Sequence, residues 1–149
     1  MKKINLLIMT VVCIFTMACC GQKSAVSSTE KIDFGRDDVW QLTSIRERAV
    51  TYAEGQDPIT IQFNPEAKTL NGHSGCNSYF GDFEYTNNGD NGTIAFDHVG
   101  STRMACPEPM MQLEDQYLPL LGKVDSFKLT AYKLTLMQGD KVLLEYDKQ

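Results

Sequence analysis

The chain has 149 residues, with 14 lysines and arginines, 19 aspartates and glutamates, and five cysteines. This length provides for about one domain, so a second, catalytic domain is excluded. The net charge of −5 includes no block of basic residues, which argues against nucleic acid as a partner.

The first 18 residues have the features of a lipoprotein signal peptide. A basic start, Met1-Lys2-Lys3, precedes an apolar run to Met17 that is short for a membrane-spanning helix. The run ends in Thr16-Met17-Ala18-Cys19, which resembles a lipobox, where a small residue precedes the cysteine that receives lipid. We expect Cys19 to be lipidated, with Cys20 as the competing acceptor. An ordinary cleaved signal or an N-terminal membrane helix is the alternative.

Residues 19–37 follow as a polar stretch with few apolar side chains. Such a composition buries too little surface to offset the ordering of the chain, so it predicts a lipidated N-terminus and a flexible tether. A first edge strand around 32–34 is the alternative. The sequence therefore predicts a protein held by its lipid in the cell envelope, at the periplasmic face of the outer membrane.

From Trp40 onward, apolar residues recur mostly at every second position, which is typical of half-buried strands. The Asn- and Gly-rich segment 87–92 and Gln138-Gly139-Asp140 have the chemistry of hairpin turns. The alternation predicts eight or nine strands, near 40–45, 50–54, 58–63, 68–73, 79–86, 93–99, 126–130, 132–138 and 141–147.

One segment departs from this alternation, because apolar residues between 108 and 121 recur every three or four positions and predict an amphipathic helix. Pro107 and Pro109 suit its first turn, and Gly122 suits its end. Pro119 removes a backbone hydrogen bond, so we expect a kink or a restart there. The whole pattern predicts a mainly β fold at 38–149: a small antiparallel barrel-like meander of about eight strands with one packed helix. A sandwich is the alternative.

Two short motifs stand out in this body. The first contains Gly75-Cys76-Asn77 within 71–79, and the second contains Thr102, Arg103 and Cys106 within 101–106. Together with Glu114, the Leu120-Leu121 pair and the flanking Trp40-Gln41-Leu42 and Leu134-Thr135-Leu136, they resemble the META domain of HslJ-like heat-shock lipoproteins over residues 38–147. The resemblance implies a small barrel-like β fold with a helix, an envelope location and a link to stress tolerance or motility. It implies no reaction and no catalytic residue.

Cys76 and Cys106 are the only cysteines in the predicted domain. An exported chain meets an oxidising compartment, so the pair predicts a disulfide. Two reduced, buried thiols are one alternative. A Cys₂His₂ zinc site with His73 and His98 is another, although the short ligand spacing is missing on the His98 side.

The remaining polar residues near the motifs point to structure more than to catalysis. Ser74 lies in Gly72-His73-Ser74-Gly75, but position 76 is Cys, so the nucleophile elbow Gly-x-Ser-x-Gly is incomplete. We expect glycines in a bulge or turn and Asn77 bonded to backbone groups. Arg103 either pairs with an acid such as Glu114 or is solvated.

The sequence therefore predicts a monomeric, non-catalytic binding domain without cofactor or metal. Its expected partner is an unidentified envelope protein or cell-wall component. The domain would act on this partner as a stress factor or inhibitor. The alternative is a lipocalin-like carrier of a small apolar ligand, in which aromatic side chains line a pocket rather than fill the barrel. These side chains are Phe63, Tyr79, Phe83, Tyr85 and Phe96.

Overall fold

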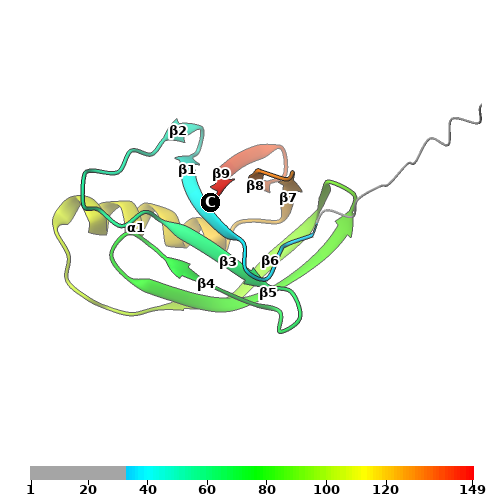
Figure 1. The fold of residues 1–149 in the computed structure, drawn as a ribbon, viewed down its shortest axis with the longest axis horizontal. Helices are drawn as coiled ribbons and strands as arrows, with labels where there is room; N and C mark the ends of the chain where they lie inside the picture. The colour runs from blue at the N-terminus through cyan, green and yellow to red at the C-terminus, as the bar shows by residue number, and fades with distance from the viewer. Residues whose placement is uncertain (1–32) are drawn as a thin grey trace, which may run out of the picture.

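The computed structural model describes residues 33–149 (Figure 1). The expected signal peptide and the lipidation candidates Cys19 and Cys20 lie outside the described residues. The described elements are β1 (Val39–Ile45), β2 (Arg48–Ala49), β3 (Thr60–Asn64), β4 (Thr69–His73), β5 (Ser78–Asn88), β6 (Asn91–Ser101), α1 (Glu108–Leu121), β7 (Ser126–Leu129), β8 (Lys133–Gln138) and β9 (Lys141–Lys148).

Eight of these strands form a closed antiparallel barrel. Neighbours run in the order β1-β3-β4-β5-β6-β7-β8-β9, and β9 pairs again with β1, so the barrel has no open edge. β2 forms only a two-residue hairpin with the end of β1. The predicted mainly β barrel of about eight strands with one helix is confirmed, and the sandwich alternative is wrong.

The two predicted hairpin turns are confirmed. Asn88 pairs with Asn91 across a turn in which Gly89 has a φ of 75°, and Gln138 pairs with Lys141 across one in which Gly139 has a φ of 56°. Glycine adopts this left-handed conformation without a steric penalty, which explains the position of both turns.

The helix spans the predicted residues, from Glu108 to Leu121, and lies against one end of the barrel (Figure 1). Pro119 lies inside it, yet the helix continues to Leu121, so the predicted restart is not found. The carbonyl of Asp115, which the proline leaves without its usual donor, belongs to an exposed residue, so water can replace the lost bond.

Three predictions of local structure were wrong. Residues 50–54 are not a strand, because the chain leaves the sheet after Ala49 and the Tyr52 hydroxyl donates to the carbonyl of Leu42 at 2.9 Å. Tyr132, the first residue of the strand predicted at 132–138, lies outside β8, which begins at Lys133, and its side chain is 78% exposed. The third concerns the start of the domain.

Phe34 falls within the predicted tether of 19–37, but its side chain is only 2% exposed and belongs to the core. Its ring centroid lies 4.4 Å from that of Phe63 and 5.0 Å from that of Phe127. Asp33, the residue before Phe34, accepts a hydrogen bond from the Tyr85 hydroxyl at 2.6 Å through its carboxylate. The ordered domain therefore begins before residue 38, and a single aromatic residue in a polar stretch gave no periodicity to reveal it.

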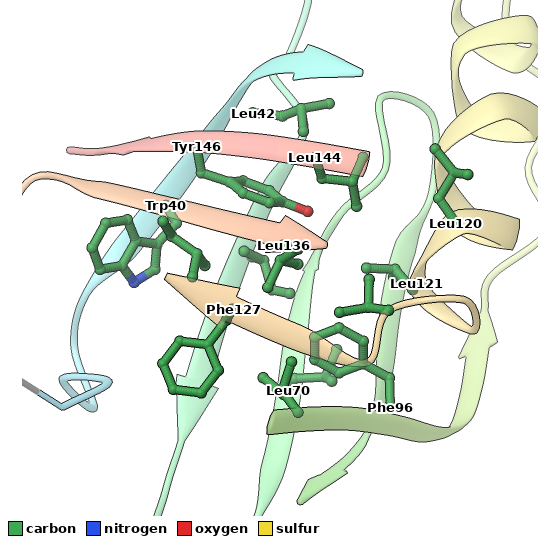
Figure 2. Close-up of a cluster of buried hydrophobic side chains, with 14 of the residues drawn as sticks. Trp40, Leu42, Leu70, Phe96, Leu120, Leu121, Phe127, Leu136, Leu144 and Tyr146 are labelled. Carbon is green, nitrogen blue, oxygen red and sulfur yellow. The ribbon is translucent and has the colours of Figure 1, made fainter. Parts of the chain in front are cut away.

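Side chains of the barrel fill its interior (Figure 2). Trp40, Leu136, Leu144 and Tyr146 from the strands are at most 1% exposed. Leu121 adds a fully buried side chain from α1. The core thus joins the barrel and the helix into one packed unit.

Candidate functional site

The first motif forms a tight loop between β4 and β5. The Ser74 amide donates to the carbonyl of Asn77 at 2.7 Å, and Gly75 between them has a φ of 98°. Ser74, Cys76 and Asn77 are each at most 3% exposed. The motif residues therefore turn inward, as expected for a glycine-dependent turn.

Glu114 of α1 reaches into this loop. Its carboxylate accepts hydrogen bonds from the Asn77 amide at 3.0 Å and from Asn77 Nδ2 at 2.9 Å. The Ser74 hydroxyl lies between Glu114 Oε2 and the Asn77 carbonyl, and its single proton serves one of them at a time. A residue of the helix thereby satisfies the buried donors of the loop.

The oxygen of the Asn77 carboxamide forms hydrogen bonds with the second motif. Asn77 Oδ1 accepts from the Met104 amide at 2.7 Å and from Thr102 Oγ1 at 2.9 Å. The expectation that Asn77 bonds backbone groups is correct. Asn77 is thus the residue through which both motifs and Glu114 of α1 meet.

A disulfide reinforces the same junction. Cys76 and Cys106 are bonded, with Cα atoms 5.9 Å apart. The predicted bridge is present, so these sulfurs are not thiolates free to bind zinc. His73 Nδ1 accepts from the Gly75 amide at 3.3 Å, and exposed His98 pairs with Asp82 at 3.0 Å. Within residues 33–149, no group of three or more His, Cys, Asp or Glu side chains is arranged to hold a metal ion.

Arg103 does not pair with Glu114. It is exposed and takes part in none of the ion pairs found in residues 33–149. The solvated alternative is therefore the correct one. The sequence suggested Arg103 as a partner of Glu114, which is wrong. The Glu114 carboxylate instead accepts hydrogen bonds from the backbone amide and the side-chain carboxamide of Asn77.

The environment of Ser74 does not suit a nucleophile. Its side chain is fully buried, and its hydroxyl contacts Glu114 and the Asn77 carbonyl. The neighbouring His73 directs Nδ1 to the backbone of Gly75. A substrate carbonyl would have no approach to the Ser74 oxygen, so these residues have the geometry of a structural junction.

Three buried tyrosines connect the helix to the barrel beside this junction. The Tyr146 hydroxyl donates to that of Tyr117 at 3.0 Å, the hydroxyls of Tyr117 and Tyr79 lie 2.6 Å apart, and Tyr79 donates to the Thr60 carbonyl at 2.9 Å. Burial raises the pKa of all three hydroxyls above the ordinary value. These tyrosines lie within the predicted strands and helix, but the periodicity of the sequence could not show that their hydroxyls meet.

The aromatic residues that a carrier would use as a pocket lining are packed together instead. Phe63 and Phe83 are 1% exposed, and their ring centroids are 5.0 Å apart. Phe34 packs against both rings and also against Tyr85. The chain's own side chains therefore fill the interior of the barrel, and the hollow of about 430 Å³ that Phe83 and Tyr85 line lies among exposed side chains such as Lys68.

No helix among residues 33–149 is long and apolar enough to cross a bilayer. The described part of the chain is a small closed barrel, capped by a helix and held to it by a disulfide and a buried polar junction. That combination defines a compact β-barrel module with a filled interior.

Comparison with known proteins identifies the family of this module. The model of the META domain family matches residues 33–149, so the chain belongs to that family. The match begins at Asp33, beside the buried Phe34.

Two structures solved by NMR have a similar fold. A protein from Burkholderia xenovorans is 29% identical, with a TM-score of 0.60 over 81% of this chain and 86% of that one. A second protein is 23% identical, with a TM-score of 0.56 over 80% of this chain and 93% of that one, and shows likeness of fold alone. No curated protein matches the chain.

Proposed function

We propose that this protein is an envelope-anchored lipoprotein whose META domain binds a partner, an envelope protein or a cell-wall component, without chemical turnover. The observation that carries the proposal is that the polar residues of the first motif face the interior of the protein. Ser74, Asn77 and Glu114 bond to one another and to the backbone, and the barrel interior is filled. Binding is therefore assigned to the outer surface.

The anchor is supported by the sequence of the N-terminus. Cys19 follows a basic start, an apolar run and a small residue, which resembles a lipoprotein signal, with Thr16 where an aliphatic residue is usual. Acyl chains that bury many methylene groups hold a domain of this size at a membrane. The stress-related or inhibitory role follows from the resemblance to heat-shock lipoproteins.

Metabolic labelling with radioactive palmitate tests the anchor. We expect label in the wild type, loss of label in Cys19→Ala and retention in Cys20→Ala; retention in both single variants and in the double variant would refute lipidation at this site.

Crosslinking in intact cells tests the binding function. Photoreactive residues placed at exposed positions of the barrel and of α1 are expected to give a discrete adduct from one face only. Adducts of the same pattern from every face, or none from any face, would contradict a specific partner.

A further inference from the structure

A groove runs between α1 and the segment that contains β2. It consists of two adjoining hollows of about 410 and 380 Å³, which share Ile45, Arg48 and Gln116. Pro109 and Leu113 line it near the start of α1, and Leu120 and Lys123 near its end. The groove follows the helix for most of its length, about 20 Å at 1.5 Å per residue.

The floor of the groove is apolar. Ile45 and Leu120 are 7% and 2% exposed, and Val50 and Leu113 pack partly buried against the core. A rim of polar residues surrounds this floor, including the carboxamides of Gln112 and Gln116. An apolar floor with a polar rim is the usual composition of a site that receives a peptide.

Three cations line the hollow at the end of α1, namely Arg46, Arg48 and Lys123, and Arg48 also lines the second hollow. All are exposed, and none takes part in an ion pair found in residues 33–149. Asp115 is the one acid that lines the two hollows. This end therefore carries an excess of positive charge on a chain whose net charge is −5.

The turn between β1 and β2 presents one of these cations. Arg46 and Glu47 have φ values of 48° and 63°, the left-handed conformation of a two-residue hairpin turn. Arg46 lines the hollow at the end of α1 and also a neighbouring hollow, which contains Glu47, Asp140 and Lys141. The hairpin thus adds a cation to the basic end of the groove.

We propose that the groove binds an extended acidic peptide of a partner protein. At about 3.3 Å per residue, its length accommodates about six residues. Apolar side chains of the peptide contact the floor beside Leu113, and its carboxylates lie among Arg46, Arg48 and Lys123. Charge complementarity favours this occupant, because the unpaired cations attract carboxylates that the rest of this acidic chain repels. This inference rests on the proposed binding function and names its partner class.

A hexapeptide array on the purified domain, residues 32–149, tests the proposal. Three consecutive positions vary over apolar residues and the other three over Asp, Glu, Asn and Gln, in both orders along the peptide. The proposal predicts binding that requires carboxylates at one end and apolar residues at the other. Binding that tolerates the amides equally, or no binding at up to about 1 mM peptide, would overturn it.

Charge-removal variants locate the site. For the strongest array peptide, Arg48→Ala and Lys123→Ala are each expected to weaken binding about threefold at low salt, and the double variant about tenfold. Lys128→Ala is the matched control, since Lys128 is an exposed cation of β7 outside the groove. An equal loss in Lys128→Ala would overturn the assignment, because it would reflect net charge alone. Urea unfolding of each variant verifies that the fold is unchanged.

The two proposals fail in different ways. A face-specific adduct in cells, combined with an array that shows no preference for carboxylates, refutes the groove and leaves the binding function intact. Carboxylate-dependent array binding, combined with no face-specific adduct in cells, refutes the binding function of the anchored protein.

Discussion

Glu114 is expected to be the largest single polar contribution to stability in this fold. It accepts from the buried Asn77 amide and from Asn77 Nδ2. Glu114→Ala leaves both donors without a partner, while the Ser74 hydroxyl keeps its 2.7 Å contact with the Asn77 carbonyl. Two orphaned buried donors at about 1–3 kcal/mol each give a loss of about 3 kcal/mol, a large share of the roughly 5–15 kcal/mol that stabilises a domain.

Urea unfolding followed by the fluorescence of Trp40, the single tryptophan, measures this loss. Glu108→Ala is the matched control, because it removes a carboxylate from the same helix. The hydrogen bond that the Glu108 carboxylate accepts from the Gln112 side chain is exposed. The control is expected to lose less than about 1 kcal/mol. A loss in Glu114→Ala within about 1 kcal/mol of the control would refute the structural role given to the motifs.

Three further predictions concern the bridge, the barrel end and the tyrosines. Replacing Cys76 and Cys106 by Ser should cost about 3.5 kcal/mol of unfolding free energy, because the bridge closes a loop with a sequence separation of 30; urea unfolding with and without reductant checks this, and an unchanged midpoint would contradict it. Phe34→Ala should cost about 3 kcal/mol, and a chain that begins at Asp38 should be less stable than one that begins at Ile32; equal urea midpoints for the two chains would show that Phe34 is not part of the core. Tyr117 is neutral in the fold with a raised pKa, so its contribution is complete below the ordinary tyrosine value of 10 and is lost as pH rises above it; unfolding at pH 8 and pH 11 should show a smaller decrease for Tyr117→Phe than for the wild type.

Local chemistry explains which parts of the fold were predictable. The turns at Gly89 and Gly139 are predictable because glycine readily adopts left-handed φ values. The helix α1 is predictable because apolar residues recur every three or four positions between the prolines at its start and the glycine at its end. Both signals act over a few residues, so the sequence displays them directly. Closure of β1 on β9 joins the two ends of the domain, so no local pattern in the sequence displays it.

The unpredicted features depend on contacts between distant segments. Phe34 meets Phe127 from the far end of the domain, and Glu114 meets Asn77 across 37 residues. Neither contact leaves a periodic pattern. The partner of a carboxylate is decided by which buried donors remain unsatisfied, and the donors that Glu114 meets belong to the loop 74–77, which contacts α1 only in the folded chain.

The junction also suggests why the two motifs occur in one small domain. Asn77 connects the loop after β4 with the segment that leads into α1, and the disulfide joins the same two segments. These contacts hold α1 at a fixed position on the barrel, and α1 forms one wall of the basic groove. The motifs therefore fix the geometry of the groove that we propose as a peptide site.

We propose that the lipid-anchored domain acts through its outer surface, because its barrel is filled. Native mass spectrometry of the mature protein extracted from envelopes tests it most directly. We expect the mass of the chain from the lipidated cysteine onward plus its acyl groups, with no further small molecule. An additional stoichiometric mass that departs when the protein is unfolded would contradict the filled barrel and restore the carrier.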